Sequence, residues 1–107
     1  MQIKIQHENF ELSDDIREIV ENRITGELNK RLTHFQEDEK RAVMNLEKID
    51  YYFVAKFDLW LPNKHHIFAQ EQGKDLLTEI YKVRDDVDRQ LEKYRDSVGW
   101  QAFNIML

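Results

Sequence analysis

The sequence predicts an α+β domain with the element order β-α-β-β-β-α, a four-stranded mixed sheet and two helices packed on one sheet face. Four segments alternate apolar and polar residues, which is the pattern of half-buried strands. Two other segments carry apolar residues at helical spacing. The chain has 107 residues, which suits one domain with a modest hydrophobic core.

The first strand and first helix are expected at the beginning of the chain. Residues 1–6 alternate as a strand does. Ser13 is a good N-cap for a helix over residues 14–32, because its hydroxyl can accept a hydrogen bond from a free backbone N–H. Gly26 lies inside this helix and is expected to bend it or shift its register. The helix has an apolar stripe made of Ile16, Ile19, Val20, Ile24 and Leu28.

Three further strands are expected at residues 42–49, 52–61 and 65–72, with a turn at Pro62-Asn63 between the last two. A helix joins the first strand to the second, so these two should pair in parallel through a right-handed crossover. Short turns join the last three strands, which should therefore form an antiparallel meander.

A second helix is expected over residues 76–98, with Asp75 as its N-cap and Gly99 just after its end. Each helix has one apolar stripe, so both should cover the same sheet face and leave the other face open. We expect a domain over 1–99 and an apolar tail over 100–107. The tail is expected to fold back on the domain or to dock on a second copy as a homodimer.

The composition limits the classes of function. Lys and Arg number 16 against 21 Asp and Glu, and the formal net charge is −5. Binding to nucleic acid depends on neutralising phosphates, so any RNA contact must come from a local basic patch. The chain has no Cys and no apolar run of signal-peptide type, which favours a protein of the reducing cytoplasm.

Several segments resemble a known family. They are MQIKI at the start, LSDDIREIVENRI at 12–24, MNLEK at 44–48, IFAQEQGKDLLTEI at 67–80 and DRQLEKYRD at 88–96. In this order they resemble the short ribosome hibernation-promoting factors and ribosome-associated inhibitors, also called sigma-factor modulation proteins. The chain differs from the family pattern at Asp86, where members commonly carry Lys, and at Glu71, where they carry a small residue.

The resemblance implies a fold like a double-stranded-RNA-binding domain with one added strand. It also implies a protein that binds the small ribosomal subunit, through rRNA and basic ribosomal proteins, in the channel used by tRNA and mRNA. Such proteins silence translation under stress or in stationary phase and are not enzymes. The alternative is a diverged member that binds a protein partner through its acidic surface or its apolar tail.

The candidate rRNA-binding residues on the helices are Arg23, Lys82, Arg89 and Lys93. The last three share one stripe of the second helix, with Asp86 among them, and could contact phosphates. The other interpretation is a solvated helix face, in which Lys82 pairs with Asp86 and Arg89 pairs with Asp85 or Asp86. Asp85, Asp88 and Glu92 form an acidic flank on the same helix, expected to repel rRNA or to meet a basic protein.

Aromatic residues on the open sheet face are a further candidate. Tyr51, Tyr52 and Trp60 could stack on bases, with Lys56 as the basic residue between them, or could simply pack across strands. His65 and His66 are adjacent in a strand and should point to opposite faces, so they are not expected to hold one metal. We expect no cofactor, no metal and no catalytic constellation.

Overall fold

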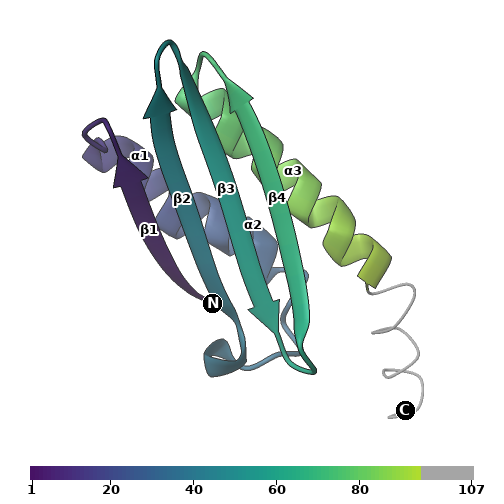
Figure 1. The fold of residues 1–107 in the computed structure, drawn as a ribbon. Helices are drawn as coiled ribbons and strands as arrows, with labels where there is room; N and C mark the ends of the chain where they lie inside the picture. Colours follow the sequence, from purple (N-terminus) through teal and green to yellow (C-terminus); the bar gives the residue numbers. More distant parts are fainter. Residues whose placement is uncertain (95–107) are drawn as a thin grey trace.

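The computed structural model describes residues 1–94, and its central feature is a four-stranded sheet (Figure 1). The strands are β1 (Gln2–Glu8), β2 (Arg41–Ile49), β3 (Tyr52–Leu61) and β4 (His65–Gly73), and they lie in that order. β1 pairs with β2 in parallel, and the other neighbours are antiparallel. The predicted topology is confirmed, and the strand bounds differ from the predicted ones by at most two residues.

The first helical segment is one run with three parts: α1 (Asp14–Glu18), the π-helical η1 (Ile19–Ile24) and α2 (Thr25–Asn29). It begins as predicted, because Ser13 Oγ accepts a hydrogen bond from the Ile16 backbone N–H at 3.2 Å. The wide turn comes just before Gly26. There the backbone N–H of Thr25 bonds the Val20 carbonyl five residues back, and the Thr25 hydroxyl donates to the same carbonyl at 2.8 Å. The helix ends at residue 29 and not at 32.

The short helix η2 (Glu37–Glu39) leads into β2 and places Lys40 in the interior. The Lys40 ammonium donates to three oxygens: Asn29 Oδ1 at 3.0 Å, the Leu32 carbonyl at 3.3 Å and Glu37 Oε1 at 3.1 Å. A buried cation is tolerated when its donors are satisfied in this way. Lys40 therefore ties the end of the first helical segment to the beginning of β2.

The last described helix is α3 (Leu76–Tyr94). Asp75 caps it as predicted, since its Oδ2 accepts from the Thr78 backbone N–H at 3.3 Å. Several predictions about the end of the chain lie outside the described residues. They are the continuation of this helix to residue 98, the domain boundary at 99, the apolar tail over 100–107 and the docking of that tail. Among the residues that are described, no helix is long and apolar enough to cross a membrane.

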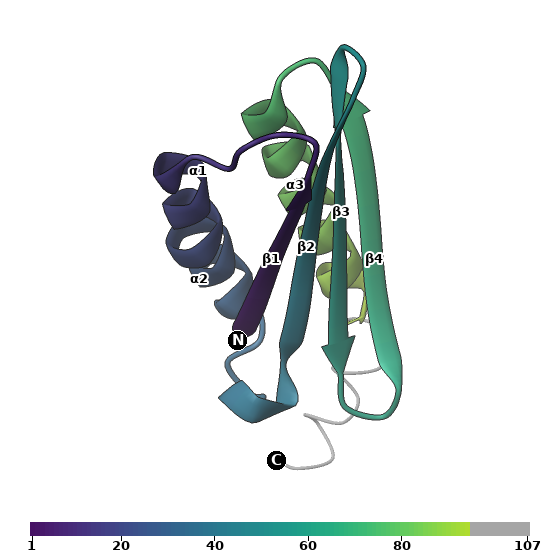
Figure 2. The ribbon, with the colours of Figure 1, turned by 60° about the vertical axis from the view of Figure 1, so that its left-hand side comes forward.

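Both helical segments lie against the same face of the sheet (Figures 1 and 2). α3 runs behind β3 and β4, and the segment from α1 to α2 begins behind β1 and crosses behind β2 toward β3. The core lies between these layers. Its fully buried side chains include Val20, Ile24, Leu28, Met44, Leu46, Phe57, Leu59, Ile67, Ile80, Val83 and Val87.

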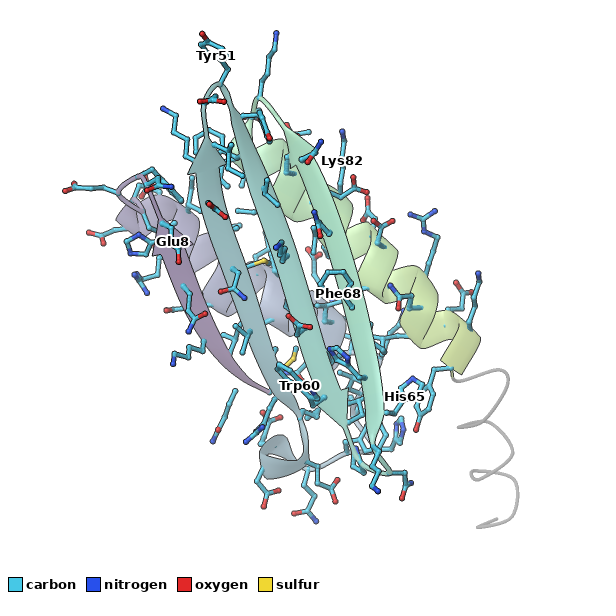
Figure 3. The ribbon with its side chains drawn as sticks, in the orientation of Figure 1. Glu8, Tyr51, Trp60, His65, Phe68 and Lys82 are labelled. Atoms are coloured by element: carbon cyan, nitrogen blue, oxygen red, sulfur yellow. The ribbon has the colours of Figure 1, made fainter. Side chains whose placement is uncertain are left out.

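The opposite sheet face carries no helix in the described part of the chain, and Figure 3 views it from the front. The pairing register arranges its side chains in cross-strand rows. One row is Gln2, Arg41, Trp60 and His66, the next is Lys4, Val43, Asp58 and Phe68, and the third is Gln6, Asn45, Lys56 and Gln70. The fourth row is Glu8, Glu47, Val54 and Gln72. We call this surface the open face.

Candidate nucleic-acid interface

The predicted basic stripe lies on the side of α3 that borders the sheet edge at β4. A groove of about 440 Å³ separates the two elements there, and Arg89 and Lys93 line it together with Phe68, Gln70 and Asp86. The Gln90 side chain bridges the groove by donating to the Phe68 carbonyl at 2.7 Å. Lys82 lies further along the same helix stripe and is exposed (Figure 3). The cations are thus beside a groove and not on the helix surface farthest from the sheet.

Acidic residues neutralise much of this stripe. Arg89 forms an ion pair with Asp86, as one of the predicted pairings had it. Lys82 instead pairs with the buried Glu79, whose Oε1 lies 3.5 Å from the Lys82 ammonium. Glu71 of β4 lies close to Asp86, and the hydrogen bond that a protonated Glu71 can donate to Asp86, together with desolvation and the charge of Asp86, raises the pKa of Glu71. The two acids that depart from the family pattern therefore lie close together, and Asp86 lines the groove.

Arg23 lies on the other side of α3, at its contact with the first helical segment. The side chain is 66% exposed, with Nε 3.8 Å from Glu27 Oε1 and Nη1 donating to the Tyr81 hydroxyl at 3.3 Å. Arg84 of α3 also bonds Glu27, at 2.8 Å. The fold therefore does not join Arg23 to the stripe of Lys82 and Arg89.

The predicted acidic flank of α3 is partly used inside the molecule. Asp88 accepts two hydrogen bonds from the Arg31 guanidinium, at 2.5 and 3.1 Å, across the contact between the two helical layers. Asp85 accepts from Arg84 at 2.8 Å. The Arg31–Asp88 bonds join the two helical segments, whereas Asp85 pairs within α3 and Glu92 is exposed. The role of this flank in repelling rRNA or meeting a basic protein stays a prediction.

The three aromatic residues predicted for the open face do not form one surface. Tyr51 is in the β2–β3 turn and is 88% exposed, and Tyr52 begins β3. Trp60 lies at the other end of that strand, as Figure 3 shows for Tyr51 and Trp60. The neighbours of Trp60 are instead residues of β4. Its ring stacks on that of His66, with centroids 5.1 Å apart and planes 6° from parallel.

Lys56 lies on the open face, as predicted, and the sequence interpretation missed the residues that surround it there. Its cross-strand neighbours are Asn45 and Gln70, and Phe68 lies diagonally from it in the next row, which also holds Lys4. Arg41 and His66 lie one row further along. Phe68 is 45% exposed, and His66 Nε2 lies 2.7 Å from Asp58 Oδ1. Strand alternation indicates that each faces outward, but only the register of all four strands shows how they are arranged in successive rows.

The histidine pair lies as predicted, on opposite sides of the sheet. His66 is on the open face, whereas the His65 ring stacks on Tyr94 of α3 with centroids 4.2 Å apart. Within residues 1–94 no three His, Asp or Glu side chains are grouped so as to hold a metal ion.

The chain resembles solved structures of proteins with this architecture. The Thermus thermophilus Protein Y N-terminal domain superposes with a TM-score of 0.71 at 25% identity, covering 89% of this chain and 100% of that one. A ribosomal subunit interface protein from Coxiella burnetii has the same fold, with a TM-score of 0.70 at 21% identity over 91% of this chain and all of its own.

Sequence comparison agrees with the fold. The chain is 33% identical over 106 residues to the ribosome hibernation promotion factor of Lactococcus lactis subsp. cremoris, which covers 97% of this chain. It spans 55% of the length of that relative. The family model described as "Sigma 54 modulation protein / S30EA ribosomal protein" matches residues 3–98. The chain therefore belongs to the sigma 54 modulation protein and S30EA ribosomal protein family.

Proposed function

We propose that this protein binds the small ribosomal subunit in the channel used by tRNA and mRNA and silences translation under stress or in stationary phase. The observation that carries the proposal is the family match over residues 3–98, which covers all the described helices and strands except Gln2, the first residue of β1. The Lactococcus relative is named for ribosome hibernation. The protein acts in the cytoplasm, by occupying a site rather than by catalysis.

The rRNA contacts are assigned to exposed cations on three surfaces. Lys82, Arg89 and Lys93 form a ridge along the groove between α3 and β4. Arg23 contributes from η1 and Lys56 from the open face. Such side chains bind phosphates and position a protein on RNA without reading its sequence. The A-form shape of rRNA suits contacts of this kind.

A charge-reversal experiment tests the ridge. The Arg89→Glu/Lys93→Glu double variant should lose ribosome association in co-sedimentation at low salt while keeping its fold, because both side chains are exposed. The matched control is Lys30→Glu/Lys64→Glu, which makes the same change in net charge at exposed positions away from the groove. The control should sediment with ribosomes as the parent does.

The salt dependence of binding gives a second measure. Each neutralised phosphate contributes a slope of roughly −0.7 to −0.9 in log affinity against log salt, so four helix cations give a slope on the order of −3. Inhibition of translation in an extract should follow the same series of variants. If the parent is missing from the ribosomal fractions even at low salt, the proposal is wrong.

A protein partner is the second candidate, because Asp86 places a carboxylate in the same groove as Arg89 and Glu71 lies close to Asp86. A basic protein would bind there without needing the cations. In that case the Asp86→Lys substitution should abolish partner binding instead of strengthening it. Truncation after Gly99 tests the proposed homodimer, since loss of residues 100–107 should then yield a monomer in sedimentation equilibrium.

A further inference from the structure

In the part of the chain that the structure describes, the open face carries cations with no carboxylate at ion-pair distance. Arg23, Lys82 and Arg89 on the helices are all within ion-pair distance of an acid. Within residues 1–94, by contrast, Lys4, Arg41 and Lys56 form no ion pair, and all three are exposed. Their charge is directed to solvent or to an external anion.

Exposed aromatic rings lie beside these cations. Trp60 is 38% exposed and Phe68 is 45% exposed. The register places Phe68 diagonally across from Trp60, on the strand that also carries His66 (Figure 3). The three rings form a patch that we call the aromatic platform: Trp60, His66 and Phe68. Large aromatic side chains gathered on an exposed sheet face indicate a binding surface rather than packing that is already complete.

The platform is held in place before any ligand arrives. The His66 ring is parallel to the Trp60 ring, and its Nε2 is fixed by Asp58 at 2.7 Å. Asp58 is the one carboxylate in the two rows that contain the platform, and it is engaged with His66. A ligand on the platform therefore meets flat rings set among cations.

Charge along the open face is divided between its two ends. Arg41 and Lys4 share the cross-strand rows of the platform, and Lys56 lies in the next row. At the far end, Glu8 and Glu47 face each other across β1 and β2. An anion is therefore attracted to the end that carries the rings and repelled from the other end.

We infer that the platform and its cations bind unpaired RNA nucleotides, with bases stacked on Trp60 and Phe68 and phosphates contacted by Arg41, Lys4 and Lys56. Flat π-faces beside a basic surface are the chemistry that holds single-stranded nucleic acid without reading its sequence. A duplex hides its base faces and offers nothing for the rings to stack on. The ribosome as the source of this RNA rests on the proposed function, whereas the binding chemistry rests on the open face alone.

Binding of a short RNA to the full chain tests the inference. In a W100F background Trp60 is the only tryptophan, so its emission reports on the platform directly. The probe is an eight-nucleotide oligouridylate at low salt, compared with the same strand in a duplex with oligoadenylate. The single strand should quench Trp60 emission, and the duplex should quench it much less.

Substitutions then separate the platform from general charge. Binding is measured here by the fluorescence anisotropy of a labelled RNA strand. The Trp60→Ala and Phe68→Ala variants should each bind the strand roughly 5- to 150-fold more weakly, the range expected for loss of one base stack. Arg41→Gln should make the salt slope shallower by about 0.7, because one phosphate contact is lost. Tyr51→Ala is the matched control, since Tyr51 is an exposed aromatic residue outside the platform, and it should bind as the parent does.

The same variants are also sedimented with ribosomes, which separates this inference from the proposed function. The parent could bind ribosomes while the oligonucleotide fails to quench Trp60 emission and Trp60→Ala keeps its ribosome binding. That result would overturn the role of the platform and leave the proposed function intact. Oligonucleotide binding that depends on Trp60, without ribosome binding by the parent, would do the opposite. If the parent is a dimer that Trp60→Ala converts to a monomer, and the parent binds no RNA, the open face contacts a second copy of the chain and the inference is overturned.

Discussion

Asp86 controls how much positive charge the ridge on α3 offers to phosphates. Its carboxylate pairs with Arg89 and raises the pKa of the nearby Glu71, and its side chain is only 26% exposed. The Asp86→Lys substitution removes this partner from Arg89, which is 69% exposed, and adds a cation to the same stripe. The fold should be kept, because position 86 lies off the buried stripe of α3.

The expected magnitude follows from the number of phosphates that become available. The introduced Lys supplies one new phosphate contact and should steepen the salt slope by roughly 0.7 to 0.9. Arg89 is already counted among the four helix cations, and loss of its Asp86 partner strengthens the contact that it makes. Affinity for ribosomes at low salt should rise accordingly. The measurement is co-sedimentation with purified ribosomes over a salt series, with the bound fraction fitted at each salt concentration.

Glu92→Lys provides the matched control. It changes the net charge by the same amount on the same helix, at an exposed position of the other flank. Global charge acts on both variants, but only Asp86→Lys releases Arg89. If the two variants tighten binding equally, or if the slope of Asp86→Lys matches that of the parent, the assignment of the ridge as a phosphate contact is refuted.

Three further predictions concern stability. Lys40→Met removes three hydrogen bonds from a buried site and should cost about 1–3 kcal/mol in urea unfolding, whereas the exposed Lys48→Met should cost little. The pKa of Glu71 is raised above its ordinary value of 4.5. Protonated Glu71 therefore adds to the free energy of unfolding below pH 4.5, and this contribution is lost as pH rises through the raised pKa. The Glu71→Gln variant should therefore have a higher melting temperature than the parent at pH 7. If this difference in melting temperature does not shrink toward pH 4.5, the charge of Glu71 is not its cause. Gly73→Ala should destabilise the fold by about 1–3 kcal/mol, because the new Cβ would lie 2.6 Å from the carboxyl carbon of the buried Glu79. Gly26→Ala should stabilise it by about 0.5–1 kcal/mol, because this helical position has open space around it.

The sequence determined the fold because its periods are unambiguous. Alternation over residues 52–61 and helical spacing after Asp75 each admit one element type, and the short turns leave few ways to connect the strands. Ser13 and Asp75 mark the helix starts by local chemistry that does not depend on the rest of the chain. Family membership was equally accessible, since it rests on motifs in order.

Tertiary structure decided which charges are neutralised and which surfaces are complete. Glu71 and Asp86 are 15 positions apart in the sequence, and Arg31 and Asp88 are 57 apart, so no local rule pairs them. The register shift expected near Gly26 takes the form of the wide turn at Ile19–Ile24, which helical spacing in the sequence does not specify. The platform of Trp60, His66 and Phe68 becomes visible once the strand register is known, because register sets which outward side chains are neighbours across a sheet.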